Sequence, residues 1–212
     1  MIKNIIFDFG GVLLNLDYSK TFDELSAVMG LEMTTEDIPS QLLKVMLAYE
    51  KGEINTETYL WHLQKESKKI TPQPNSLIKA WNAMLLGWNP DRFEFLIELR
   101  KHYRVFLLSN TNDLHLKWVR NDLEKNHNII DFDTVYFEQT FYSHEMNMRK
   151  PDPQIYESVL DQCNLVPGET MFIDDNLSNI KAAQKVGIVG VHHDPANEII
   201  DILPKYLEET TA

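Results

Sequence analysis

The sequence predicts an α/β protein with a Rossmann-like core, in which a parallel sheet lies between two helical layers and an all-helical cap is inserted. Two observations indicate this fold. Short apolar, β-rich segments alternate along most of the chain with amphipathic helical segments, a pattern typical of a parallel sheet covered on both faces. One long block near the N-terminus interrupts the alternation and reads as helical throughout.

The first strand is predicted at residues 5–7, where an apolar run leads into Asp8 and is then broken by Gly10 and Gly11. This pattern indicates a buried strand that enters a tight turn. Similar apolar runs predict four more strands, at residues 105–108, 134–137, 170–173 and 188–191. Helical patterns lie between and after these runs, at about 90–102, 113–125, 153–164, 177–186 and 196–207.

Residues 16–88 form the block that breaks this rhythm. They contain no strand of the core type, and Asp, Thr and Asn residues punctuate several helical stretches. Because the block falls between the first and second strands, we expect it to be an inserted helical cap. The chain then divides into a core of residues 1–15 and 89–212 and a cap of residues 16–88.

Composition restricts the class of protein and its partners. The chain of 212 residues is 43% hydrophobic and 25% charged, which is typical of a soluble globular protein. Its net charge of -12, without a cluster of basic residues, argues against a nucleic-acid partner. No segment approaches the ~20 apolar residues that span a bilayer, so no membrane partner is expected. A single cysteine, Cys163, and the lack of a signal peptide predict a cytoplasmic protein.

Polar residues end three of the predicted strands and are candidates for a site. Asp8 ends the first strand, Ser109 and Asn110 the second, and Asp174 and Asp175 the strand at 170–173. In open α/β sheets, ligands bind at the carboxyl ends of the strands, so we expect these side chains to converge. Two carboxylates from neighbouring strands make a hard oxygen site that suits Mg²⁺.

Lys150, which precedes Pro151, is positioned in the sequence to reach the same edge. A serine hydroxyl, backbone amides at a helix start and a lysine ammonium together make an anion cradle. A metal site, an anion cradle and a free carboxylate are the equipment for phosphoryl transfer through an aspartyl-phosphate. The expected partner is therefore a small phosphate ester.

Four ordered motifs carry a resemblance over essentially the whole chain: Asp8 to Val12, Ser109-Asn110, Lys150 to Pro153, and Ile173 to Asp175. They resemble the motifs of the haloacid dehalogenase (HAD) superfamily of hydrolases. The cap segment Gly52-Glu53-Ile54 and the residues around the later motifs are similar to the α-D-glucose-1-phosphate phosphatase branch. That similarity implies a magnesium-dependent phosphatase with a sugar-phosphate substrate such as glucose 1-phosphate.

The resemblance also implies a role for each matching residue. Asp8 would be the nucleophile and a ligand of Mg²⁺, with the backbone carbonyl of Gly10 and the carboxylate of Asp175 as the other protein ligands. Asp174 would support the site or reach the metal through water. Phosphate oxygens would be held by Ser109 and Asn110, while Lys150 would bridge the nucleophile and the phosphate.

One departure from the superfamily pattern affects the mechanism. Most of its phosphatases carry a second aspartate two residues after the nucleophile as general acid and base, and Gly10 occupies that position here. Losing positioned acid–base help typically costs ~10²–10⁴-fold in rate. Three alternatives follow: Asp17 substitutes, the substrate or a water network carries the proton, or the protein is a slow or inactive relative. The glucose-1-phosphate branch also has glycine here, which favours activity by a modified route.

Other functions remain as alternatives at this point. A metal-independent haloacid dehalogenase also lacks the second aspartate, but the Asp174-Asp175 pair argues against it because a metal site would be idle. A phosphomutase is less favoured, since it relies on the missing acid and base. A non-catalytic binder is supported by Gly10 and opposed by the other complete motifs. His192 and His193 are not expected to bind one ion, because adjacent strand residues point to opposite faces.

Overall fold

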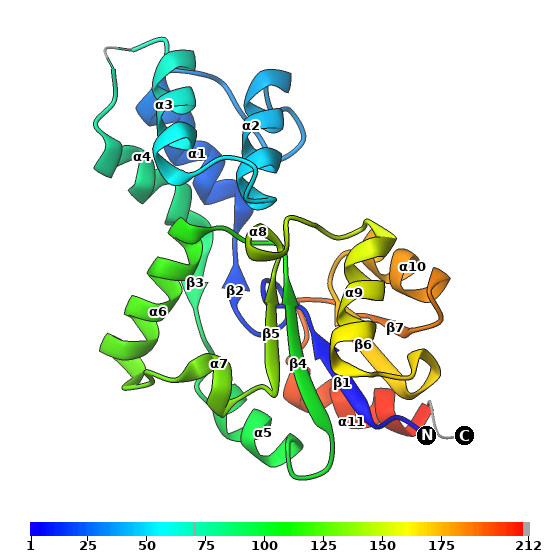
Figure 1. Cartoon of the computed structure of the whole chain (residues 1–212). Coiled ribbons are helices and arrows are strands. Elements are labelled where there is room, and N and C mark those ends of the chain that lie inside the picture. The colour runs from blue at the N-terminus through cyan, green and yellow to red at the C-terminus, as the bar shows by residue number, and fades with distance from the viewer. Residues whose placement is uncertain (70, 210–212) are drawn as a thin grey trace.

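A five-stranded parallel sheet forms the centre of the computed structural model, which describes residues 1–69 and 71–209 (Figure 1). The strand order is β5-β4-β1-β6-β7, with β1 in the middle. The strands are β1 (Asn4–Phe7), β4 (Arg104–Ser109), β5 (Gln139–Tyr142), β6 (Thr170–Asp174) and β7 (Val189–His192). All four residues of β1 pair in register with both β4 and β6. The parallel Rossmann-like core that the sequence predicts is therefore confirmed.

Helices cover both faces of the sheet (Figure 1). One layer contains α5 (Asp91–Leu99), α6 (Asp113–His127), α7 (Phe132–Val135) and α11 (Ile199–Glu209). The other contains α9 (Pro153–Cys163) and α10 (Leu177–Lys185), and the short elements α8 (Ser143–Met146) and η2 (Pro167–Glu169) flank the sheet.

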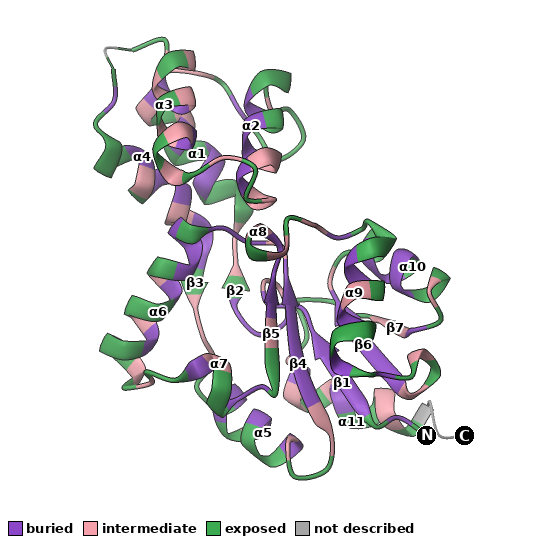
Figure 2. Ribbon diagram, in the orientation of Figure 1, coloured by how far each residue is buried: buried purple, intermediate pink, exposed green. Residues whose placement is uncertain are grey.

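Alternation along the strands divides the core between the two layers. Ile5 and Phe7 pack in the cluster with α5, α6, α7 and α11, whereas Ile6 packs in the cluster with α9 and α10. Successive strand residues point to opposite faces, so a strand covered on both sides is apolar at every position. The inner strands β1, β4 and β6 are buried almost throughout, the edge strands β5 and β7 are only partly buried, and the outward helix faces are exposed (Figure 2). This explains why the strands read as continuous apolar runs in the sequence.

A separate group of helices, called here the helical unit, lies beyond the carboxyl ends of the strands (Figure 1). It consists of α1 (Tyr18–Met29), α2 (Ser40–Glu50), α3 (Thr56–Glu66), α4 (Pro74–Trp81) and η1 (Asn82–Met84). The unit has its own hydrophobic cluster, which includes Tyr49 stacked on Tyr59 with ring centroids 4.3 Å apart. Two chain crossings connect it to the sheet.

The crossings form a two-stranded antiparallel ribbon, β2 (Asn15–Leu16) and β3 (Leu85–Gly87). The sequence analysis missed this ribbon. Strands of two and three residues are too short to show an alternating pattern, and their pairing joins segments that are far apart in the chain. The ribbon brings Leu16 and Leu85 to the space between the sheet and the helical unit.

The strand predicted at residues 134–137 is wrong. This segment overlaps α7, and the edge strand β5 begins at Gln139. Phe132 and Tyr136 lie one helical turn apart and pack together in the core with ring centroids 5.4 Å apart. β5 begins with an exposed Gln139 because it pairs only with β4, at the edge of the sheet. Its polar start hid it from a search for apolar runs.

Side-chain caps fix the beginnings of the helices that border the site. The side chain of Asn112 accepts from the backbone N–H of His115 at the start of α6, and that of Asn176 accepts from Ser178 at the start of α10. Such N-caps typically stabilise a helix by about 1 kcal/mol. Because Asn176 is the cap residue of α10, the preceding Asp174 and Asp175 are not needed for that role. None of the described helices has the length and apolar character needed to cross a membrane.

Candidate active site

The candidate site lies where the carboxyl ends of β1, β4 and β6 meet the helical unit. A cavity of about 650 Å³ opens there, and its lining includes Asp8, Gly10, Ser109, Asn110 and Asp175. Lys150 lines the same cavity from the loop before α9. The structure thus brings all the site residues expected from the sequence to one place, as the parallel topology requires.

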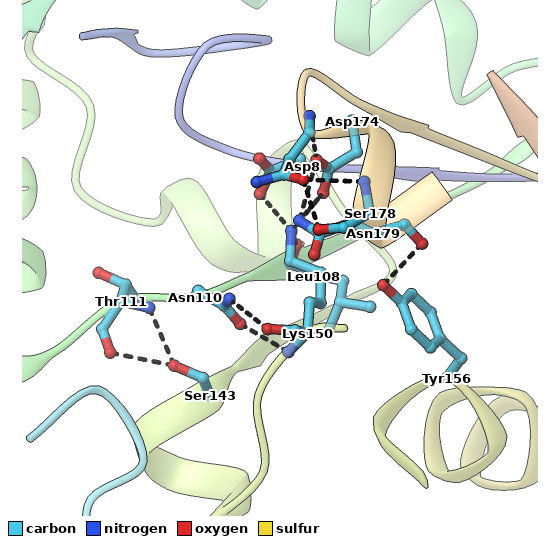
Figure 3. A network of polar contacts seen from close by, with 11 residues as sticks. Asp8, Leu108, Asn110, Thr111, Ser143, Lys150, Tyr156, Asp174, Ser178 and Asn179 are labelled. Carbon is cyan, nitrogen blue, oxygen red and sulfur yellow. Dashed lines mark hydrogen bonds and ion pairs between the residues drawn. The ribbon is translucent and has the colours of Figure 1, made fainter. Parts of the chain in front are cut away.

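Lys150 is the buried centre of this site (Figure 3). Its ammonium donates to three oxygens: Asp8 Oδ1 at 2.6 Å, Asp174 Oδ2 at 2.7 Å and the carbonyl of Leu108 at 2.9 Å. An ammonium has three N–H donors, so its hydrogen-bonding capacity is filled. Asp8 Oδ2 has no hydrogen bond from the described residues and remains the free oxygen of that carboxylate.

Burial sets the electrostatics of the lysine and its partners. Burial raises the pKa of Asp8 to about 7, the charge of Asp174 adds to the rise, and Lys150 opposes it. Burial by itself would lower the pKa of Lys150, but the charges of Asp174 and Asp8 outweigh it and the pKa is raised. Lys150 is therefore held as a cation, and it favours the ionised form of the carboxylate that faces the cavity.

Asp174 serves as a positioning group within the site. Its Oδ1 accepts from the backbone N–H of Asn176 at 2.7 Å and from the side chain of Asn179 at 3.0 Å, while Oδ2 binds Lys150 (Figure 3). The carboxylate is fully buried, and both of its oxygens are occupied. Its contacts fix Lys150 against Asp8 and leave it less available to an ion than the neighbouring carboxylates.

Asp8, Asp174 and Asp175 form a candidate metal cluster, with one oxygen from each lying within 4.8 Å of the others. When all three carboxylates are ionised, the single ammonium of Lys150 leaves two negative charges in excess. Burial raises the pKa of Asp175, and the charge of Asp174 raises it further. Hard oxygen ligands with an excess charge of this size fit a divalent cation such as Mg²⁺.

Glycine at position 11 makes room for Asp175. A Cβ at Gly11 would lie 2.4 Å from Asp175 Oδ2, and the backbone there has φ = +77°. Both the contact and the backbone conformation require glycine. At Gly10 a Cβ would lie 2.3 Å from Cδ1 of Leu16, the end of a flexible side chain. Glycine is therefore required at position 11 by both the backbone conformation and Asp175, whereas at position 10 the neighbour is only the end of a flexible side chain.

The side chain of Asn110 is committed to the lysine loop. It donates to the carbonyl of Lys150 and accepts from the backbone N–H of the same residue, each at 2.9 Å. Only the backbone N–H of Asn110 is then a candidate for contact with a phosphate. Ser109, which is buried at the end of β4, presents its hydroxyl in the lining of the cavity.

Asp17, the candidate replacement for the missing acid and base, lies elsewhere. It caps α1, where its Oδ1 accepts from the backbone N–H and the hydroxyl of Ser19. The hydrogen bond from the Ser19 hydroxyl lowers the pKa of Asp17. Asp17 is absent from the described residues that line the cavity, so its geometry does not favour the acid–base role.

The sequence analysis missed two ionisable residues of the cavity, Glu50 and Arg149. Arg149 donates to Glu50 Oε2 at 3.0 Å, and the Glu50 carbonyl accepts from the hydroxyl of Ser143 at 2.6 Å. These contacts connect α2 to the sheet edge. Burial raises the pKa of Glu50, with Arg149 opposing the rise. Glu50 lies two residues before Gly52-Glu53-Ile54 and Arg149 directly precedes Lys150, and this closeness to the quoted motifs is the sequence signal that could have indicated them.

The histidines of the site region differ in their surroundings. His115 stacks on Trp81, and burial lowers its pKa to about 4, so its ring is neutral. His192 lines the cavity and binds the carbonyl of Asp175 through Nε2 at 2.8 Å. His193 is buried away from the cavity lining. His192 and His193 therefore lie in different surroundings, one at the cavity and one in the protein interior.

Carboxylates gather around a buried lysine at the carboxyl edge of a parallel sheet and face a cavity. The sequence profile of haloacid dehalogenase-like hydrolases matches residues 2–187. The chain belongs to that family.

Relatives of known activity match almost the whole chain. A D-ribitol-5-phosphate phosphatase of Bacteroides thetaiotaomicron is 26% identical over 193 residues, covering 88% of this chain and 89% of that one. A sesquiterpene phosphatase of Aspergillus oryzae is 30% identical over 200 residues, covering 90% and 89%.

A solved structure shows the same fold. The crystal structure of a HAD family enzyme from B. thetaiotaomicron superposes with a TM-score of 0.86 at 32% identity, covering 95% of this chain and 98% of that one. The wild-type protein was also solved with magnesium and inorganic phosphate, and that structure has a TM-score of 0.81 at 32% identity, covering 93% and 97%.

Proposed function

We propose that the protein is a Mg²⁺-dependent phosphatase that hydrolyses a small phosphate monoester through an aspartyl-phosphate on Asp8. The main support for this proposal is the contact between Asp8 Oδ1 and the buried ammonium of Lys150 at 2.6 Å. The other oxygen of Asp8, Oδ2, remains free beside the cavity. A carboxylate that is oriented by a fixed cation, which favours its ionised form, is suited to nucleophilic attack. The relatives with phosphatase activity support the same chemistry.

The metal would be held by the carboxylates of Asp8 and Asp175 and by the backbone carbonyl of Gly10. Asp174 is occupied by Lys150 and Asn179, so its role is to position the lysine. When bound at such a site, Mg²⁺ supplies positive charge that offsets the repulsion between a carboxylate and an anionic phosphate. The magnesium complex of the Bacteroides enzyme supports this cofactor.

The chain's own residues provide the rest of the reaction. Asp8 Oδ2 attacks phosphorus as the ester P–O bond breaks, and the alcohol departs with a proton taken from water or the substrate. Ser109, through its hydroxyl, and Asn110, through its backbone N–H, would hold phosphate oxygens. Water then attacks the aspartyl-phosphate, which releases phosphate and restores the carboxylate. Lys150 orients Asp8 in both steps, and to bridge to the phosphate it would exchange one of its three present acceptors.

Two substrate classes compete for this site. A sugar phosphate such as glucose 1-phosphate is implied by the resemblance in sequence. The ribitol-phosphate phosphatase and a phosphorylated carbohydrates phosphatase of Thermotoga maritima, 26% identical over 205 residues, support the same class. The Aspergillus relative acts on a terpenoid instead. In either case the proposed partner is a small phosphate ester, in the cytoplasm, without nucleic acid or membrane.

The helical unit has the position of a cap. We assign residues 16–88 to the cap and residues 1–15 and 89–212 to the core, of which residues 210–212 lie outside the described part of the chain. The ribbon of β2 and β3 would let the cap close over the cavity and exclude water during the reaction.

The test is phosphate release from a panel of phosphorylated metabolites with Mg²⁺ and with EDTA. Asp8→Asn is expected to abolish the release, and Asp161→Asn, an exposed carboxylate on α9, is the matched control. Unchanged metal-dependent release by Asp8→Asn would contradict the Asp8 mechanism. Halide release from a 2-haloacid that survives EDTA would instead identify a dehalogenase, and no turnover of any compound would identify a binding protein.

A further inference from the structure

We infer that the alcohol part of the substrate is apolar, so that the preferred ester is an alkyl, alkenyl or aromatic monophosphate and not a polyol phosphate. This inference rests on the proposed phosphatase function and selects between its two substrate classes. It comes from the chemistry of the cavity wall that faces the sheet edge.

The two walls of the cavity differ in polarity. The sheet-edge wall carries the carboxylates, Lys150 and the candidate phosphate-binding groups, so the phosphate belongs there. The opposite wall comes from the helical unit and the β2–β3 ribbon and is predominantly apolar, with Phe22, Leu43, Met46, Leu47, Met84 and Leu85 in its lining. A phosphate held at the sheet edge would therefore direct its ester group towards aliphatic side chains.

Some of this apolar lining is exposed. On the helical unit, Tyr18 has an exposed fraction of 49% and Leu43 of 40%, and both line the cavity. Leu177, at the start of α10 on the sheet side of the same cavity, has an exposed fraction of 47%. Large apolar side chains gain from being covered, because removing apolar area from water is favourable. An apolar ligand would cover them, whereas a polyol would bring its own hydration shell into contact with them.

Most polar groups near this wall are already paired within the protein. The Trp81 indole donates to Asn112, and the two ring nitrogens of His115 bind Asn112 and the Trp81 carbonyl. Glu50 accepts from Arg149. The indole of Trp81 and the ring of His115 cannot bind a ligand hydroxyl without giving up a present partner.

Two polar groups of the lining are suited to an oxygen of the ligand beside the phosphate. Arg149 Nε is a buried donor without a partner, and Arg149 adjoins Lys150. Desolvation of the Tyr18 hydroxyl and the nearby charges of Asp8 and Asp175 raise its pKa, so the hydroxyl stays protonated although much of the side chain is exposed. These groups suffice for the ester oxygen beside the phosphate. Most hydroxyls of a pentitol or hexose would lie against the aliphatic side chains of this wall, and each hydroxyl left unpaired costs roughly tenfold in affinity.

The test is a comparison of kcat/KM across n-alkyl phosphates from ethyl to pentyl, with ribitol 5-phosphate as the five-carbon polyol. All are primary esters, so differences in leaving-group chemistry are small. We expect kcat/KM to rise about two- to fourfold per methylene. Pentyl phosphate should exceed ribitol 5-phosphate by at least about tenfold.

Two outcomes separate this inference from the function on which it rests. If kcat/KM stays flat or falls with chain length, or if ribitol 5-phosphate is preferred, the inference of an apolar leaving group is wrong. The proposed phosphatase function would be unaffected by that result. No phosphate release from any of these esters or from p-nitrophenyl phosphate overturns the phosphatase, and the inference with it.

A pair of leucine variants tests the wall directly. Leu43→Ser should lower kcat/KM for pentyl phosphate by about three- to tenfold and lower it less for ethyl phosphate, because the shorter chain covers less apolar area of the wall. Leu86→Ser is the control, since Leu86 has an exposed fraction of 47% and lies outside the cavity lining. Equal losses for both esters in Leu43→Ser would indicate a general structural defect and overturn the assignment of the wall.

Discussion

The ammonium of Lys150 lies 2.7 Å from Oδ2 of Asp174, and the two side chains have exposed fractions of 1% and 0%. Removing one partner of a buried ion pair leaves an uncompensated charge, which is more costly than removing both. Lys150 also binds Asp8, so this pair determines where the proposed nucleophile points. We therefore expect Asp174 to act on the proposed reaction through Lys150.

The buried pair should be visible in the free energy of unfolding. Lys150→Met should destabilise the protein by about 3–5 kcal/mol, because it leaves two carboxylates without their cation. Adding Asp174→Asn in the same chain should recover part of this loss. Urea unfolding in EDTA of both single variants and the double variant measures the coupling, for which we expect at least about 1 kcal/mol. Strictly additive effects would contradict the pairing.

Asp175 should control metal affinity. Asp175→Asn removes one of the two carboxylates assigned to the ion, so the Kd for Mg²⁺ should rise by at least about tenfold. Titration calorimetry with Mg²⁺ measures this without any substrate. Asp161→Asn should bind Mg²⁺ like the wild type. Equal affinity in the Asp175 and Asp161 variants would remove Asp175 from the metal site.

Gly11→Ala should damage the metal site through the backbone. The added Cβ would meet Asp175 Oδ2 at 2.4 Å, in a conformation with φ = +77° that side chains disfavour. We expect a loss of about 1–2 kcal/mol in stability and weaker Mg²⁺ binding. Gly168→Ala is the matched control, because a Cβ there meets nothing within 4 Å. Equal Mg²⁺ affinity in the two alanine variants would contradict the assignment of Asp175, beside Gly11, to the metal site.

Restoring an acid at position 10 should accelerate the reaction if proton transfer limits it. Gly10→Asp requires space, so it is best combined with Leu16→Ala, which removes the atoms that a new side chain would meet. The aspartate variant should exceed the matched Gly10→Asn, Leu16→Ala variant by about tenfold or more in kcat on alkyl phosphates. Equal rates in the two variants would show that the missing aspartate does not limit turnover.

His115 should make stability depend on pH. Its pKa is lowered from 6.5 to about 4 by burial, so between these values the unfolded chain binds the proton and the folded chain does not. Stability must then fall as pH falls through this window. From pH 7 to pH 5 the wild type should lose about 2 kcal/mol more than His115→Phe, as measured by urea unfolding in EDTA. Equal losses would show that His115 protonates freely in the folded protein.

The comparison of sequence and structure separates local signals from long-range ones. The strand at 5–7, its terminal Asp8 and the helices around the sheet followed from apolar runs and punctuation, because these are properties of neighbouring residues. The strand predicted at 134–137 was wrong because helical and strand spacing are alike over four residues. The β2–β3 ribbon was missed because its stability comes from pairing distant segments.

The candidate site shows the same division. Asp8, Ser109, Lys150 and Asp175 were found because each follows or precedes a recognisable element. Glu50 and Arg149 were not found, since their contact joins α2 to the lysine loop and depends on how the helical unit sits over the sheet. The same limit applied to Asp17, whose place near a chain crossing suggested a role that its capping of α1 does not support.

The sequence by itself determined an α/β fold with carboxylates and a lysine at the ends of parallel strands, and its motifs resemble those of a hydrolase family. It could do so because parallel strands bring their carboxyl ends to one edge whatever the details of packing. Only the tertiary structure decided which atoms of those residues contact one another. Lys150 donates its three hydrogen bonds to Asp8, Asp174 and Leu108, and the opposite wall of the cavity is apolar. Both features depend on contacts between segments that are distant in the sequence.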